Sequence, residues 1–125
     1  MRSQISSMTV GIPVRDLSEA TAWYRALLGS RREIAPAPGV HEFELLPRSW
    51  LQLLASAKAE RSECIVRIGV CDIDVEHKRV SELGGDPSPI ETVPGVVRYF
   101  EFWGPYGNRL SFYQGFVQGS DERAA

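Results

Sequence analysis

The chain has 125 residues, of which 43% are hydrophobic and 24% charged, and its formal net charge is −2. This balance indicates one globular domain over residues 1–125 with a core of its own, and it argues against nucleic acid as a partner. No apolar run reaches the ~20 residues of a membrane span, and two cysteines without CxxC spacing are typical of reduced thiols in a cytoplasmic protein.

The first half of the sequence predicts a strand, a helix and three further strands. Alternating apolar residues indicate the first strand, and Asp16 or Ser18 caps the helix that Gly29 ends. The predicted strands cover residues 8–14, 31–35, 41–46 and 50–55. Residues 8–55 therefore form a βαβββ module, and the polar residues 56–63 form a linker.

The second half shows the same pattern. Asp72 begins a helix that Gly84 ends, and three prolines within residues 86–95 predict a flexible stretch. The predicted strands of this half cover residues 64–70, 96–103 and 110–116. The second module therefore covers residues 64–116, and a flexible tail covers residues 117–125.

The two halves repeat each other at an offset of 56 residues. Val14-Arg-Asp16 before the first helix returns as Val70-Cys-Asp72 before the second. Near the end of each half the offset becomes 59, where residues 51–53 match residues 110–112. A repeat of this length indicates the duplication of a whole supersecondary unit, so each residue can be compared with its twin.

Strand alternation divides the side chains of each half between two faces. Apolar rows such as Val10, Ile12 and Val14 predict the face that packs under the helices. On the opposite face rings alternate with hydrogen-bonding groups, which suits an organic ligand, because rings supply contact area and polar groups fix orientation. The candidate ligand-binding residues are Trp50, Gln52, Arg67, Tyr99, Glu101, Trp103, Ser111 and Tyr113. A solvated sheet face or a dimer interface is the alternative.

Several motifs resemble those of a known superfamily. They are the paired βαβββ units, Val14-Arg-Asp-Leu17, Ala22-Trp-Tyr24, Leu28-Gly29 and the closing Gly104-Pro-Tyr-Gly-Asn-Arg-Leu110. Together they resemble the vicinal oxygen chelate superfamily, which includes glyoxalase I, bleomycin-resistance proteins, fosfomycin-resistance enzymes and extradiol dioxygenases. The resemblance covers roughly residues 8–116 and departs from the usual closing Asp-Pro-Asp-Gly-Asn at Gly104 and Tyr106. It implies an α+β fold, with an eight-stranded cup, helices on the outer face and a homodimer.

The same resemblance implies where a divalent metal would be held. The matching positions are Thr9, Gln52, Ile65 and Ser111. Only Gln52 can coordinate, and a neutral amide alone does not compensate the charge of a divalent ion. We therefore expect no conventional metal and no cofactor. A displaced site would have to use His41, Glu42, Glu44 or Glu101.

Three functions are open at this point. The leading hypothesis is a metal-free protein that binds a small organic molecule, as in the bleomycin-resistance branch. The second is a superfamily enzyme (a lyase, isomerase, dioxygenase or thiol transferase) with a displaced metal site. The third is a catalytically degenerate dimerisation or regulatory module. No catalytic residue is assigned, because no spacing indicates a nucleophile with its base.

Overall fold

The computed structural model describes residues 3–115, so the predicted strand end at Phe116 and the predicted tail over 117–125 lie outside the described residues. The chain divides into two compact units between Glu60 and Arg61, inside the predicted linker. Each unit is a βαβββ module, which confirms the α+β class and the two-module fold. Within residues 3–115, no helix has the length and apolar character needed to cross a membrane.

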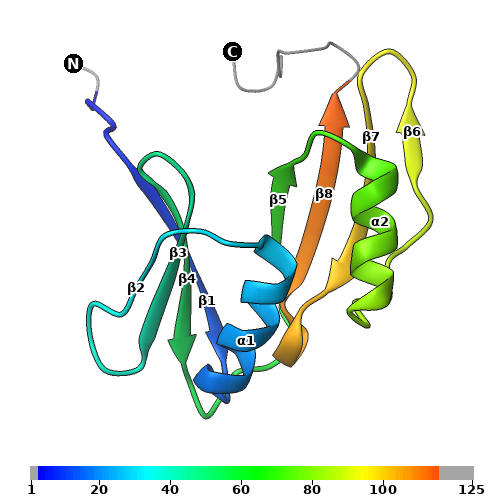
Figure 1. The fold of residues 1–125 in the computed structure, drawn as a ribbon. Helices are drawn as coiled ribbons and strands as arrows, with labels where there is room; N and C mark the ends of the chain where they lie inside the picture. Colours follow the sequence, from blue (N-terminus) through cyan, green and yellow to red (C-terminus); the bar gives the residue numbers. More distant parts are fainter. Residues whose placement is uncertain (1–2, 116–125) are drawn as a thin grey trace. The chain divides into compact units, whose positions relative to one another are not determined.

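The first module contains one four-stranded sheet and one helix (Figure 1). Its elements are β1 (Met8–Val14), α1 (Leu17–Leu28), β2 (Glu33–Ile34), β3 (Val40–Leu46) and β4 (Ser49–Ala55). The strands lie in the order β1-β4-β3-β2, with β1 parallel to β4 and the other pairs antiparallel. Helix α1 packs against β3 and β4.

The second module has the same topology, as its duplication predicts. Its elements are β5 (Ile65–Gly69), α2 (Ile73–Glu82), β6 (Glu91–Val93), β7 (Val97–Trp103), the 3-10 turn η1 (Pro105–Gly107) and β8 (Arg109–Gly115). The strands lie in the order β5-β8-β7-β6, and β5 is parallel to β8. Helix α2 packs against β7 and β8, so the helix of this module covers one face of its sheet and leaves the other face open.

Twin aspartates begin the two helices. Oδ1 of Asp16 accepts a hydrogen bond from the N–H of Glu19 at 3.0 Å, and Oδ1 of Asp72 accepts one from the N–H of Val75 at 3.2 Å. Each carboxylate satisfies a backbone donor that has no partner inside the helix, and its charge suits the positive end of the helix dipole. Of the two caps expected for the first helix, Asp16 is therefore the one used.

The apolar rows form the core between each sheet and its helix. The side chains with almost no exposure include Leu51, Leu53, Phe100, Phe102, Leu110 and Phe112. The three phenylalanine rings of this set have centroids 5.0 to 5.9 Å apart, within the range of favourable ring pairs. The helix-side face predicted from strand alternation is thus confirmed, and the ring and polar residues of the same strands point the other way.

The stretch over 86–95, predicted to be flexible, contains a strand. Residues Glu91–Val93 form β6, which pairs antiparallel with β7 at the edge of the sheet. Ser88 is also tied to β7: its N–H donates to the carbonyl of Glu101 at 2.8 Å, and its Oγ accepts from the N–H of Glu101 at 2.9 Å. Nε2 of His77 donates to the Ser88 carbonyl at 2.8 Å. The three prolines led to the wrong prediction because all of them lie outside β6. As an edge strand, β6 needs backbone hydrogen bonds only to β7.

Candidate functional site

The open face of the second sheet, opposite α2, carries three rows of side chains across β5, β8 and β7. The register aligns Gly69, Tyr113 and Tyr99 in one row, Arg67, Ser111 and Glu101 in the middle row, and Ile65, Arg109 and Trp103 in the third. Residues directly opposite each other on neighbouring strands share a face. Six of the eight candidate residues from the sequence therefore lie together on this face, and the other two belong to the first module.

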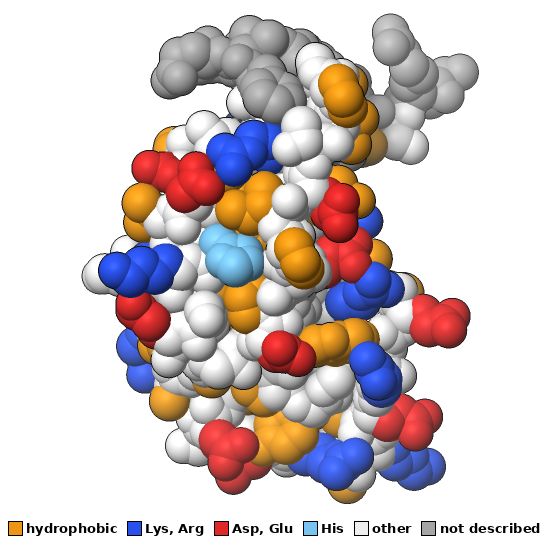
Figure 2. Space-filling model, turned by 90° about the vertical axis from the view of Figure 1, so that its right-hand side faces the viewer, with side chains coloured by type: hydrophobic (Ala, Val, Ile, Leu, Met, Phe, Trp, Pro, Cys, Tyr) orange, Lys and Arg blue, Asp and Glu red, His pale blue; other side chains and the backbone are white. Residues whose placement is uncertain are grey.

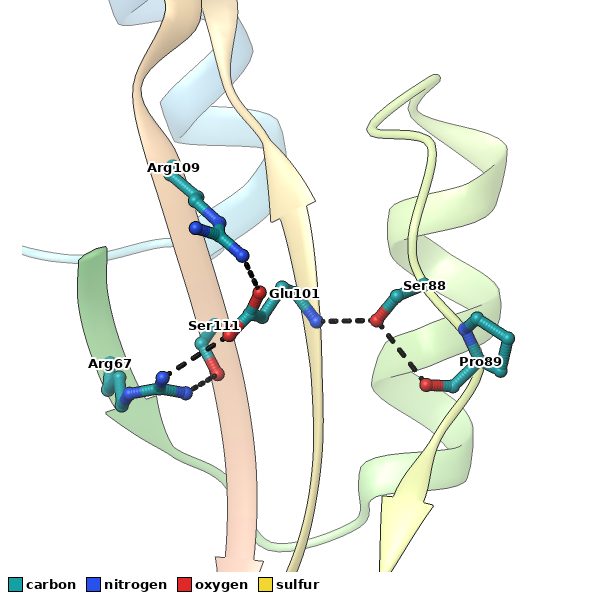
Figure 3. A network of polar contacts seen from close by, with 6 residues as sticks. All are labelled: Arg67, Ser88, Pro89, Glu101, Arg109 and Ser111. Carbon is teal, nitrogen blue, oxygen red and sulfur yellow. Dashed lines mark hydrogen bonds and ion pairs between the residues drawn. The ribbon is translucent and has the colours of Figure 1, made fainter. Parts of the chain in front are cut away.

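The middle row forms a chain of polar contacts that extends to Arg109 of the third row (Figure 3). Nη1 of Arg67 donates to Oγ of Ser111 at 3.0 Å, and Nη2 of Arg67 donates to Oε2 of Glu101 at 3.2 Å. The other carboxylate oxygen of Glu101 accepts from Nη2 of Arg109. The carboxylate of Glu101 thus accepts hydrogen bonds from two guanidinium groups. The side chains of Arg67, Arg109 and Glu101 together carry a net charge of +1.

Arginines also lie over the aromatic rings of this face. The guanidinium carbon of Arg61 is 4.1 Å from the centroid of the Trp103 ring, and that of Arg109 is 5.8 Å from the same ring. The corresponding distance from Arg67 to the Tyr99 ring is 5.6 Å. These distances fall within the ~6 Å range of cation–π attraction, so the rings help to hold the arginines over the sheet.

A glycine makes room for the third ring of the face. A Cβ atom placed on Gly69 would lie 3.2 Å from Cζ of Tyr113 and 3.3 Å from its hydroxyl oxygen. The Tyr113 ring therefore leans from β8 over the backbone of β5, where any larger residue at position 69 would crowd it.

The two candidate residues of the first module, Trp50 and Gln52, lie on the open face of its own sheet. Nε2 of Gln52 donates to Oε2 of Glu42 at 2.5 Å, and these two residues are opposite each other in the register of β3 and β4. The guanidinium carbon of Arg32 lies 5.5 Å from the centroid of the Trp50 ring. Each module therefore places a tryptophan under an arginine on its open face.

Comparisons with solved structures place this geometry in a known fold. A glyoxalase/bleomycin resistance protein from Catenulispora acidiphila is 24% identical, with 86% of this chain and 96% of that chain covered and a TM-score of 0.69. A fosfomycin resistance protein from Mesorhizobium loti is 25% identical over 100% of both chains, with a TM-score of 0.69. A lactoylglutathione lyase from Agrobacterium tumefaciens is 18% identical, covers 95% of this chain and 100% of that chain, and has a TM-score of 0.72.

The chain has the vicinal oxygen chelate fold. Sequence comparison alone does not lead there, since no family model matches the chain and no curated protein matches it. The resemblance inferred from the closing turn motif and the repeated modules is confirmed by structure.

The residues at the metal positions of the vicinal oxygen chelate fold do not fit a divalent ion. Ser111 is fully buried, and its Oγ accepts a hydrogen bond from a guanidinium cation. Thr9 is exposed and offers a hydroxyl, Ile65 offers no ligand atom, and the amide of Gln52 is bonded to Glu42. Uncharged oxygens without a carboxylate or imidazole are a poor donor set for the metals of this fold. We therefore derive no chemistry through a metal.

Of the residues available for a displaced metal site, His41, Glu42 and Glu101 are engaged in other side-chain contacts. Nε2 of His41 lies 2.8 Å from Oε1 of Glu33, on the helix side of the first sheet. Glu33 also accepts two bonds from Arg25, and these bonds lower the pKa of the Glu33 carboxyl to about 2, with a smaller contribution from His41. Among residues 3–115 no three His, Cys, Asp or Glu side chains form a group that could hold a metal ion.

Sequence reasoning missed two arginines of the second-sheet face. Arg109 stands two residues before Ser111 in β8, so strand alternation alone places it on the same face. Arg61 lies in the predicted linker, and nothing in its sequence context indicates that it covers Trp103.

The side of the molecule shown in Figure 2 carries both basic and acidic side chains. They are interspersed, and neither kind gathers into a continuous patch.

Proposed function

We propose that the open face of the second sheet binds a small organic ligand without the conventional divalent metal. The observation that carries this proposal is the polar row of Arg67, Ser111 and Glu101, which lies between Tyr99 on one side and Trp103 on the other. The rings offer stacking area, and the polar row offers donors and acceptors that orient a bound molecule. Trp50 and Gln52 remain ligand contacts predicted from the sequence.

A thermal-shift screen tests this function directly. The screen should cover aromatic acids, their neutral amides, bleomycin and fosfomycin, because resistance proteins for the last two share the fold. A ligand at 100 times its dissociation constant stabilises the native state by about 2.7 kcal/mol, which is easily measured. The same shift in excess chelator supports binding without a metal, whereas shifts that occur only after metal addition contradict it.

Metal analysis of untagged protein separates this proposal from an enzyme with a displaced metal site. We expect less than stoichiometric zinc, manganese, iron and nickel after purification without chelator, because the donor set lacks a charged ligand. One metal ion per chain would favour the enzyme. A screen in which nothing binds would favour the third possibility, a dimerisation or regulatory module.

Two further parts of the proposal concern assembly and location. The vicinal oxygen chelate fold implies pairing of chains, so we propose a homodimer, and multi-angle light scattering tests this.

Cys64 and Cys71 are both free and exposed, which suits the reducing cytoplasm. Mass spectrometry of protein alkylated at cell lysis should find both thiols reduced.

A further inference from the structure

We propose that Arg67 and Arg109 bind the anionic group of the ligand, and that Glu101 occupies their guanidinium groups until the ligand arrives. This inference rests on the proposed function and names the chemical class of ligand: an organic acid whose carboxylate or phosphonate is attached to a ring. The anionic oxygens are the part of the ligand that the two arginines recognise.

The geometry of the three side chains supports an exchange of one anion for another. Arg67 and Arg109 reach Glu101 from opposite sides, and each binds a different oxygen of its carboxylate (Figure 3). Each guanidinium donates one N–H to one carboxylate oxygen, and such charge-assisted bonds to carboxylates and phosphates are stronger than bonds between neutral groups. Glu101 thus marks the position that an external anion would take.

The net positive charge around Arg67 and Arg109 favours the binding of an anionic ligand. Two guanidinium groups and one carboxylate leave one positive charge, and the guanidinium of Arg61 over Trp103 adds another. Glu91, which is opposite Tyr99 in the register and is exposed, is the only other carboxylate at the described positions aligned with these rows. An organic anion would therefore reduce the repulsion among the arginines.

The side chains are accessible, while the backbone beneath them is fixed. The exposed fractions of the side chains are 40% for Arg67, 35% for Arg109 and 21% for Glu101, so a solute can reach all three. The backbone of Glu101 is held by Ser88 on both its N–H and its carbonyl. Exchange therefore requires rotation of one carboxylate side chain and no movement of the strand.

Arg67 also explains why this face works without a metal. Its Nη1 is bonded to Ser111, the residue that stands at a metal-ligand position of the vicinal oxygen chelate fold. A fixed guanidinium there supplies the positive charge that an ion supplies elsewhere, and it needs no charged protein ligand. The adjacent rings of Tyr99 and Trp103 then receive the ring to which the anion is attached.

Isothermal titration with benzoate, phenylphosphonate and neutral benzamide, in chelator throughout, tests this assignment. Glu101→Gln removes the internal competitor, and we expect it to bind benzoate about tenfold more tightly than the parent protein. Arg67→Gln and Arg109→Gln should each weaken benzoate binding about tenfold or more. Phenylphosphonate beside benzoate shows which anion the pair prefers, and both should bind better than benzamide.

Two control variants separate this assignment from general effects of charge. Glu91→Gln changes the net charge as Glu101→Gln does but frees no arginine, so we expect a change of less than twofold. Arg98→Gln removes an arginine of β7 that pairs with Asp74 and lies outside the three rows, and it should also leave benzoate binding unchanged. Circular dichroism of each variant confirms that it is folded.

Each result supports or overturns the assignment. Tighter benzoate binding in Glu101→Gln together with loss in both arginine variants supports it. Equal binding of benzamide and benzoate, with no effect of Glu101→Gln, overturns the anion site while leaving small-ligand binding intact. Failure of all three probes to bind any variant overturns the anion site, and only an empty broader screen removes the proposed function as well.

Discussion

Arg67 on β5 donates a hydrogen bond from Nη1 to Oγ of Ser111 on β8, over a distance of 3.0 Å. The two residues are direct partners in the parallel register of the first and last strands of the second module. Ser111 is fully buried although it lies on the open face, and the guanidinium of Arg67 satisfies its hydroxyl. This contact therefore gives a buried hydroxyl its partner and fixes the direction of the guanidinium.

A double-mutant cycle should detect this contact as a coupling energy. We expect Ser111→Ala to lower the free energy of unfolding by about 1 kcal/mol, since a buried hydrogen bond is lost. In an Arg67→Ala background the same change should cost about 0.5 kcal/mol or less, because its partner is already absent. Urea titration of the four proteins measures both values, and identical costs in the two backgrounds would show that the residues are independent.

Glu33 should make the stability of the first module depend on acidity. Hydrogen bonds from Arg25 hold the pKa of Glu33 at about 2, below its value in the unfolded chain. The folded state therefore binds this proton only at a lower pH than the unfolded chain does. This contribution is complete above the unfolded pKa of about 4.3 and is lost as the pH falls toward 2. Glu33→Gln should therefore be less stable than the parent protein above pH 5, and the difference should shrink steadily on acidification.

The matched control is Glu82→Gln at the end of α2, where the carboxylate is exposed. Urea midpoints of the three proteins at several pH values between 2.5 and 6 provide the comparison. We expect the Glu82→Gln curve to run parallel to the parent curve and the Glu33→Gln curve to be flatter. A Glu33→Gln curve parallel to the parent would contradict the pairing with Arg25.

Strand faces could be predicted from the sequence, because a period of two leaves only one way to bury Leu51, Leu53, Leu110 and Phe112. The repeat confirmed each assignment through its twin. The edge strand Glu91–Val93 escaped prediction because three exposed residues between prolines carry no alternation. Its position depends on pairing with β7 and on the bonds of Ser88, which are tertiary contacts that no local pattern records.

The candidate site was predictable in part for the same reason. Alternation places Arg67, Glu101 and Ser111 on one face, and it would also have placed Arg109 there. Their ion pairs depend on which strands are neighbours, and that information lies in the fold. Arg61 could not be found by any strand rule, because the turn before β8 determines where its backbone runs.

Tyr24 carries a buried hydroxyl that has no hydrogen-bond partner among the described residues. Removing it in Tyr24→Phe should raise the free energy of unfolding by about 1 kcal/mol, since an unsatisfied polar group costs that much.

Burial also raises the pKa of Tyr24 well above its ordinary value, so the hydroxyl ionises at a lower pH in the unfolded chain than in the folded protein. Stability should therefore fall above pH 10 in the parent protein and less so in Tyr24→Phe. Denaturation curves at pH 7 and above pH 10 measure this, and a destabilised Tyr24→Phe would reveal a partner for the hydroxyl.

Gly107 in the turn before β8 allows the backbone of Arg61 to pass close by. Its φ is +79°, and a Cβ atom there would lie 2.5 Å from Cα of Arg61. Gly107→Ala should cost about 1 kcal/mol for the left-handed φ and a further 1–3 kcal/mol for the overlap. Gly95→Ala is the control, because its φ of +73° is similar but no atom lies within 4 Å of the added Cβ. Urea denaturation should show the larger loss for Gly107→Ala, and tryptophan fluorescence should change with it as Arg61 leaves Trp103. Equal losses in the two variants would mean that the backbone conformation alone requires glycine.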